Sequence, residues 1–312
     1  MVLDDAKVKT SAAVASIGVN VFLLALKGTV GVITGSVALW ASFADSLLDL
    51  TASCFALVGV KVGARPPDVT HAYGHAKFES LSSLVQLALL FVTVGVIATQ
   101  AVERLRTGAE VSAETWGVAV IAVSLVVDLW ISRRLTNAAA ASGGSHALEA
   151  DALHFRTDVW SNLAVIAGLI AAAAGLPVAD PIAALVVALF VAVTAVGLLR
   201  STAGVLTDHA PDEDTVRAIA ETLSSFPEVE DVHTLRARMV GSRIFLDVCV
   251  ELDPDLTFKR AHDLTHEMQD RLRSRVTDIA DAVIHFEPAG HPEHQDTQHH
   301  AHGMDALAVD EP

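Results

Sequence analysis

The sequence predicts a membrane protein with two parts: a helical domain of six membrane spans over residues 11–204, and a small cytoplasmic α+β domain over residues 205–289. Three observations predict this class. Hydrophobic residues make up 52% of the 312 residues, and the mean hydropathy is +0.47, which is too apolar for an ordinary soluble domain. Six stretches each hold the roughly 20 apolar residues that cross a bilayer. After Arg200, these long stretches give way to short alternating runs.

The six apolar stretches define the order of the membrane domain. Two of their connections, 34–36 and 175–177, are very short, so we expect spans 1 and 2, and spans 5 and 6, to form antiparallel hairpins. The predicted spans are residues 11–33, 37–60, 79–102, 114–132, 151–175 and 178–199.

Basic residues orient the predicted spans. Cytoplasmic loops of membrane proteins carry an excess of Lys and Arg. Two basic residues, Arg104 and Arg106, lie on one side of the predicted spans, and eight lie on the other. This rule places both termini in the cytoplasm, with residues 1–10 as a cytoplasmic N-terminus. The eight residues are Lys7, Lys9, Lys61, Arg65, Lys77, Arg133, Arg134 and Arg200.

The formal charge of −16 is concentrated in the second part of the chain. From Val205 onward there are 23 acidic and 9 basic residues. An acidic surface favours cations and excludes nucleic acid as a partner. The two cysteines, Cys54 and Cys249, provide no disulfide framework and indicate a reducing compartment.

The α+β domain is predicted to contain two helices that cover one face of a sheet. The predicted elements are a helix over 211–225, strands over 231–239 and 243–251, a helix over 257–275 and a strand over 282–286. This order is ferredoxin-like and metallochaperone-like, and it needs one further early strand to complete a βαββαβ sheet. Residues 290–312 are predicted to be a disordered, histidine-rich tail.

Two pairs of metal-binding residue types lie inside the predicted spans. Asp45 and Asp49 are four residues apart in the second span, and His154 and Asp158 repeat that spacing in the fifth, so each pair shares a helix face. A charged side chain at membrane depth costs about 2.5–3.5 kcal/mol, which these four groups offset if they bind a divalent cation tetrahedrally. The alternative is that they are hydrogen-bonded contacts between helices. Further candidates for such contacts, or for the ion path, are Asn20, Lys27, Gln86, Asp128 and Asn162.

The loop between the second and third spans contains a second group. Asp68, His71 and His75 follow one another at short spacing and suit a transition metal if the loop turns or coils. The alternative is a solvated loop that contains two histidines.

Further ligand types are spread through the α+β domain. His233 and Cys249 lie on neighbouring predicted strands, and His285 and Glu287 alternate onto one side of the last strand. His262 shares a helix face with His266. Imidazole, thiolate and carboxylate are zinc ligands, although histidines scattered over a surface are an equally simple explanation.

The order, depth and spacing of these groups resemble the cation diffusion facilitator family, and most closely its bacterial zinc, cadmium and iron efflux branch. The likeness covers about residues 10 to 289. It implies that the two intramembrane pairs form the transport site and that the loop group forms a second site. The soluble domain of that family binds a pair of zinc ions at a dimer interface, which by position implies His233, His262 and His285, with Glu287. Cys249 stands where similar proteins often have histidine.

The resemblance implies a homodimer in the bacterial inner membrane that is a transporter and not an enzyme. We expect it to export divalent transition metals, with Zn²⁺ first and Cd²⁺, Fe²⁺, Co²⁺ or Mn²⁺ as other candidates. The exchange would be with protons, by alternating access in the lipid bilayer. Zn²⁺ or another divalent metal is then both the substrate and a regulatory ligand of the cytoplasmic sites.

Two other functions fit some of the same residues. A metal sensor or receptor would bind metal at these groups without transporting it. An intramembrane aspartyl protease would use Asp45 and Asp49 as an acid/base pair. However, the Gly-x-Gly-Asp context of such proteases is missing, and His154 and Asp158 would have no role.

Overall fold

The computed structural model describes residues 2–35, 37–107, 115–173, 176, 178–276 and 278–290. The chain divides into two compact units between Leu206 and Thr207. The predicted histidine-rich tail lies outside the described residues from His291 onward, as do Ser36, Gly175 and Pro177 of the predicted short connections.

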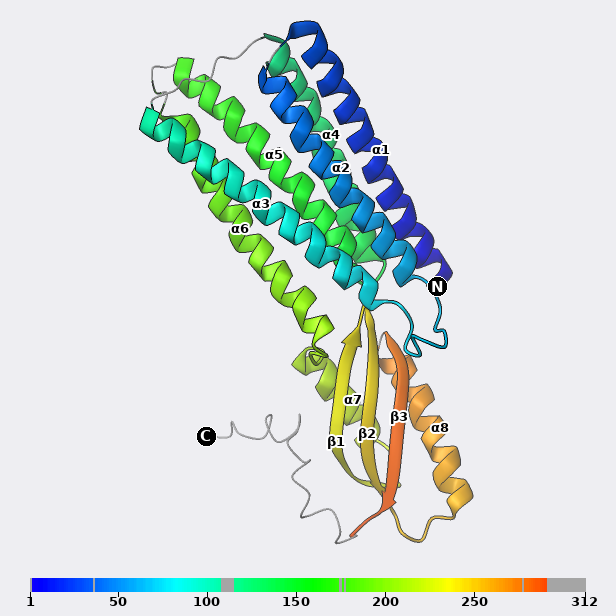
Figure 1. The fold of residues 1–312 in the computed structure, drawn as a ribbon. Helices are drawn as coiled ribbons and strands as arrows, with labels where there is room; N and C mark the ends of the chain where they lie inside the picture. The colour runs from blue at the N-terminus through cyan, green and yellow to red at the C-terminus, as the bar shows by residue number, and fades with distance from the viewer. Residues whose placement is uncertain are drawn as a thin grey trace, which may run out of the picture. The chain divides into compact units, whose positions relative to one another are not determined.

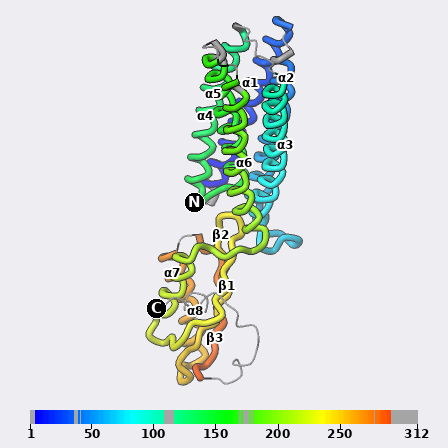
Figure 2. The backbone as a smooth tube through the Cα atoms, turned by 90° about the vertical axis from the view of Figure 1, so that its left-hand side faces the viewer, coloured from blue at the N-terminus to red at the C-terminus, as the bar shows by residue number. Residues whose placement is uncertain are grey.

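Six long helices form the first unit over its described residues (Figure 1 and Figure 2). Each has 27 to 33 residues. At about 1.5 Å per residue the shortest is about 40 Å long, which exceeds the hydrocarbon core of about 30 Å. Helices suit this setting because their backbone hydrogen bonds are internal. They are α1 Val2–Thr34, α2 Val37–Gly63, α3 Lys77–Thr107, α4 Thr115–Ala141, α5 His146–Ala173 and α6 Ala179–Leu206.

The helices extend beyond the predicted spans. α1 begins at Val2 instead of residue 11, and α4 continues to Ala141 instead of ending at residue 132, because helical hydrogen bonding continues past the apolar stretch into polar sequence. α5 carries Asp151, Arg156 and Asp158 in its first half. Within the described residues, four segments have the length and apolar composition of a membrane span: Asp5–Thr34, Ser42–Gly63, Lys77–Thr107 and Pro181–Leu206.

α5 lies between two hydrophobic clusters and packs against α2, α3, α4 and α6. Phe155 packs with residues of α1, α2 and α4, whereas Leu153 belongs to a cluster with residues of α3 and α6. His154, between them in the sequence, is 4% exposed. The first half of α5 is therefore enclosed by protein, which is where charged groups inside a membrane domain are tolerated.

A buried ion pair joins three segments of this bundle. Lys9 Nζ of α1 lies 3.1 Å and 3.3 Å from the two carboxylate oxygens of Glu79 of α3, and both residues are buried. Between α4 and α5, Ser145 donates a hydrogen bond to Glu79 Oε2, and the Gly144 carbonyl accepts one from Lys9 at 3.5 Å. These additional bonds satisfy the pair, as burial of two charges requires.

The second unit is an α+β domain whose described elements run helix, strand, strand, helix, strand. They are α7 Glu213–Ser224, β1 Val229–Val240, β2 Arg243–Leu252, α8 Phe258–Arg275 and β3 Ile279–Pro288. β2 is the central strand, antiparallel to β1 and parallel to β3. The predicted helices and strands are present, but no strand precedes α7 in residues 207–212, so the sheet lacks the fourth strand of a complete βαββαβ order.

Local sequence explains where these elements begin and turn. The Asp212 side chain accepts a hydrogen bond from the Thr215 amide at 2.8 Å and caps α7, and Thr257 caps α8 in the same way. β1 and β2 are joined by a two-residue turn in which Gly241 has φ of 64°. That left-handed conformation favours glycine.

α7 and α8 cover one face of the sheet (Figure 1). Leu246, Val248 and Val250 alternate along β2 and are buried in one core with Leu223 of α7 and Leu264 of α8. The intervening residues of β2 must point to the opposite face. That open face is where the ligand types of the three strands meet.

The packing of α2 against α3 predicts the effect of one small substitution. A Cβ atom built on Gly59 would lie 2.5 Å from Ser82 Cβ, and Ser82 Oγ donates a 2.6 Å hydrogen bond to the Phe55 carbonyl. We expect Gly59→Ala to lower the melting temperature of the purified chain, because overpacking costs about 1–3 kcal/mol. Gly18→Ala is the matched control, since nothing lies within 4 Å of its added Cβ. Equal melting temperatures for the two variants would contradict this close approach.

Candidate metal centres

The first candidate centre, the intramembrane group, lies where α2 and α5 pack together. Asp49 of α2 and His154 and Asp158 of α5 each bring one ligand atom within 4.8 Å of the others. His154 Nε2 lies 2.7 Å from Asp49 Oδ1, and both residues are buried. Two carboxylates and one imidazole are a ligand set for a divalent transition metal.

Asp45, the fourth residue predicted for this centre, lies outside the group of three. It is one turn before Asp49 on α2, and it is exposed. The sequence did not predict this exposure, because an apolar stretch does not reveal which face of a helix its neighbours cover. The next residue, Ser46, accepts a 2.7 Å hydrogen bond from Lys27 Nζ of α1. In the described arrangement Asp45 therefore does not supply a fourth ligand atom to the group.

Hydrogen bonds from α1 support the α2 side of the intramembrane group. Asn20 Nδ2 donates to the Asp49 carbonyl at 3.3 Å and to Ser53 Oγ at 2.8 Å. Ser53 also accepts from Ser16 and donates to Asp151 Oδ1, each at 2.7 Å, so its hydroxyl uses its donor and both acceptor positions. The sequence predicted Asn20 as a candidate for such a contact, but not Ser16, Ser53 or Asp151. Ser53 could have been predicted from its position one turn after Asp49, on the same face of the helix.

The second candidate centre is the loop between α2 and α3. Asp68, His71 and His75 have ligand atoms within 4.8 Å of one another. His75 Nε2 lies 3.2 Å from Asp68 Oδ2, and His71 Nδ1 lies 3.4 Å from Asp68 Oδ1. The His75 Nδ1 atom lies 3.1 Å from the Pro66 carbonyl, which can only accept, so Nδ1 carries the proton. This bond leaves Nε2 available to a metal.

The loop carboxylate is held ionised by its own turn. The Thr70 hydroxyl and the backbone amides of His71 and Thr70 donate hydrogen bonds to Asp68 Oδ1, and these bonds lower the pKa of Asp68 to about 2. A carboxylate that stays charged at neutral pH is ready to bind a cation. The loop therefore has the turn on which the prediction of a metal site there depended.

The third candidate centre, the sheet group, lies on the open face of the α+β domain. His233, Cys249 and Glu287, one from each strand, have ligand atoms within 4.8 Å of one another. His233 Nε2 lies 2.9 Å from Glu287 Oε1, and the Cys249 thiol donates to the same oxygen at 3.3 Å. Asp231 and Glu251 form an overlapping group with His233.

A bulge in β1 sits beside the sheet group. His233 pairs with Cys249 and Arg236 pairs with Asp247, so two residues of β1 face one residue of β2. Thr234, the residue after His233, has φ of 51°, which is unusual for a residue other than glycine. Such bulges redirect side chains, and this one lies where His233 turns toward Glu287.

Three predicted histidines of the α+β domain lie outside the sheet group. His285 is beside Cys249 in the strand register but is exposed. His262 and His266 are exposed on α8, with ring centroids 4.7 Å apart. α8 covers the opposite face of the sheet, so His262 does not reach the sheet group within one chain.

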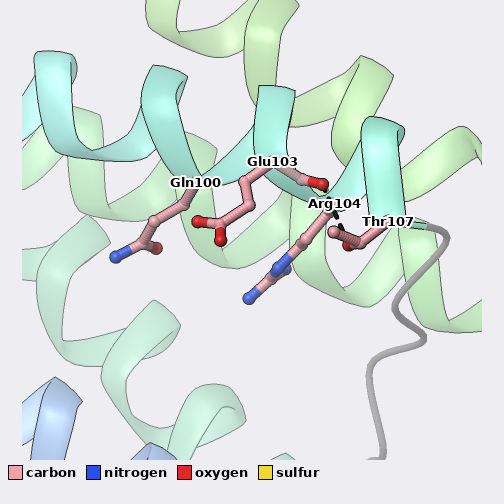
Figure 3. Close-up of a pocket in the computed structure, with 4 residues that line it drawn as sticks. All are labelled: Gln100, Glu103, Arg104 and Thr107. Atoms are coloured by element: carbon pink, nitrogen blue, oxygen red, sulfur yellow. Dashed lines mark hydrogen bonds between the residues drawn. The ribbon is translucent and has the colours of Figure 1, made fainter.

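A pocket at the end of α3 contains none of the predicted ligands. Gln100, Glu103, Arg104 and Thr107 line it (Figure 3), and the Thr107 hydroxyl donates to the Glu103 carbonyl at 2.9 Å. The pocket combines one acidic and one basic side chain, which is not a metal-ligand set.

Comparisons with known proteins identify the family. A model described as the cation efflux transmembrane domain matches residues 13–207, and a model of the cytoplasmic domain of cation efflux proteins matches residues 211–289. The chain belongs to the cation diffusion facilitator family. As a facilitator it is a multi-pass membrane protein of the metal efflux class and not an enzyme. The aspartyl protease alternative is therefore wrong.

Two relatives cover most of this facilitator, and one solved domain covers about a quarter of it. The cation-efflux pump FieF of Shewanella oneidensis is 31% identical over 274 residues, covering 88% of this chain and 92% of that protein. The manganese efflux system protein MneS of Bacillus subtilis is 28% identical over 288 residues, covering 91% and 97%. The metal-bound C-terminal domain of the CzcD transporter from Thermotoga maritima is 36% identical, covering 26% of this chain and 93% of that domain, with a TM-score of 0.25.

The thiol of the sheet group predicts a measurable proton release. Burial, followed by the hydrogen bond to Glu287, raises the pKa of Cys249 to about 12, so the thiol is protonated at pH 7 without metal. A metal binds the thiolate, so we expect Cys249→Ala to release about one proton fewer per chain saturated with Zn²⁺ than the unaltered chain. Calorimetry in two buffers of different ionisation enthalpy measures this number. Cys54→Ala is the matched control, and equal proton release in both variants would show that Cys249 is not a ligand.

Proposed function

We propose that this facilitator exports divalent transition metals from the cytoplasm in exchange for protons, with Zn²⁺ as the leading substrate. The observation that carries the proposal is the intramembrane group of Asp49, His154 and Asp158, with its 2.7 Å contact between imidazole and carboxylate. Apolar residues would pack between these helices at a lower free-energy cost, so packing alone does not account for such a group. Asp45 completes the transport site in another state of alternating access.

Proton exchange follows from the chemistry of these ligands. A metal binds the deprotonated carboxylates and the neutral imidazole, so protons and metal compete for the same atoms. Moving one charge through 100 mV involves about 2.3 kcal/mol, and a divalent cation leaving an inside-negative cell must overcome about twice that. Protons that enter through the same atoms offset this cost.

The ligand set narrows the choice of transported metal but does not select one ion. Two carboxylates and one imidazole suit Zn²⁺ and also admit Cd²⁺, Fe²⁺, Co²⁺ and Mn²⁺. The names of two relatives, a cation-efflux pump and a manganese efflux protein, support divalent transition metals as the class. A flux assay with several metals is therefore needed to order them.

The loop and sheet groups are proposed as regulatory sites on the cytoplasmic side of a homodimer. The cytoplasmic domain that this chain matches supports dimer formation and metal binding. Both groups combine imidazole with carboxylate, and we propose that His262 and His285 of a second copy approach the open face on which the sheet group lies. We propose the bacterial inner membrane as its location, as the family resemblance implies, and both termini in the cytoplasm on the distribution of basic residues.

Flux through the purified chain tests the proposal. We expect Asp49→Asn to abolish metal entry into proteoliposomes under an imposed pH gradient, because the uncharged amide leaves His154 without its charged partner and the metal with one carboxylate in place of two. An internal zinc-sensitive dye reports the flux. Glu103→Gln, which removes a carboxylate from the end of α3, is the matched control and should transport at the rate of the unaltered chain.

Two results would contradict the proposal. Gradient-driven flux that persists in Asp49→Asn would show that the intramembrane group is not the transport site. If the unaltered chain moves neither zinc nor iron, manganese or cadmium, but still binds them, the sensor alternative becomes the better explanation.

A further inference from the structure

A buried carboxylate on α4 lies outside all three metal-binding groups. Asp128 is 2% exposed. Its Oδ2 accepts a hydrogen bond from Asn162 Nδ2 of α5 at 3.3 Å. Its Oδ1 is buried and has no hydrogen-bond partner in the described part of the chain. A carboxylate in this setting is costly unless something binds it.

The position of Asp128 relates it to the intramembrane group. Asn162 is one helical turn after Asp158 on the same face of α5, and α4 packs against α5. Asp158 itself belongs to the intramembrane group, with a ligand atom within 4.8 Å of those of Asp49 and His154. Asp128 therefore lies beside the group, at the level of α5 one turn beyond Asp158 and two turns beyond His154.

The partners of Asp128 do not balance its charge. Asn162 is neutral, and Asp158 and Asp49 repel a second carboxylate. Among the described residues Lys27 forms no ion pair with Asp128, and its Nζ donates to Ser46 Oγ. A divalent cation would satisfy the free Oδ1 and the charge together. The Asn162 side chain can contribute as well, since rotating its amide by half a turn presents a carbonyl oxygen in place of the N–H.

We propose that Asp128 and Asn162, sharing Asp158 with the intramembrane group, form a second cation-binding position for divalent ions that accept oxygen ligands alone, such as Mn²⁺. The first position contains an imidazole and suits zinc, whereas two carboxylates and an amide oxygen suit a harder cation. The two positions are one turn apart, so an ion can pass between them through Asp158. This inference rests on the proposed function only in that the ion is the one transported.

Equilibrium binding separates the two positions. The full chain is purified with the loop and sheet groups disabled by His71→Ala, His75→Ala, His233→Ala and Cys249→Ala, and radioactive Mn²⁺ and Zn²⁺ are titrated separately. We expect Asp128→Asn, which preserves shape, to weaken Mn²⁺ binding by about tenfold or more and Zn²⁺ binding by less than about threefold. Ser124→Ala is the matched control, because Ser124 is buried one turn earlier on α4 and its hydroxyl also lacks a partner in the described residues.

Each outcome bears on one proposal. If Asp128→Asn weakens Mn²⁺ and Zn²⁺ binding equally, or changes the binding of neither, the second position is overturned. Equal weakening is also the result expected of a carboxyl group that only carries protons. A selective loss of Mn²⁺ that Ser124→Ala also shows overturns it too. If the unaltered chain transports no metal in vesicles but Asp128→Asn selectively loses Mn²⁺ binding, the second position stands and the transport proposal fails.

Discussion

Charge buried among the helices is the constraint on which the membrane domain depends. Asp49 and His154 are buried together, and the 2.7 Å contact between them lets each reduce the cost of the other. Asp151 is fully buried, and its Oδ1 accepts a hydrogen bond from the Ser53 hydroxyl. These groups persist because neighbouring helices supply partners that lipid does not. α5 is accordingly the helix that other helices enclose.

Helical spacing turns these separate groups into one continuous polar column. On α2, Asp49 and Ser53 are one turn apart, and on α5, His154 and Asp158 are one turn apart. Asp49 contacts His154 and Ser53 contacts Asp151, so α2 and α5 run antiparallel with matching levels. The column reaches α1 through Asn20. The column therefore places polar side chains at successive turns of α2 and α5, which an isolated pair would not do.

Much of this arrangement could be predicted from the sequence, and the rest depends on side-chain contacts that spacing does not encode. Apolar length predicted the six helices, and i, i+4 pairs predicted that Asp49 meets His154. Spacing says nothing of the helix face that neighbours cover, so the exposure of Asp45 was missed. The Lys9–Glu79 pair joins residues 70 apart, and no local pattern marks it. In the sheet, residue alternation did not distinguish Glu287, in the group, from His285, outside it.

The same constraint on charge explains why an exporter would exchange metal for protons. Asp49 and Asp158 carry two negative charges when ionised, and the enclosed space between α2 and α5 favours states without net charge. A divalent cation neutralises the two carboxylates, and so do two protons. A site that is empty and fully deprotonated is the costly state, so it is passed through only briefly as one occupant replaces the other. In the proposed exchange, coupling would then arise from the cost of the unoccupied site, without a separate gate that senses protons.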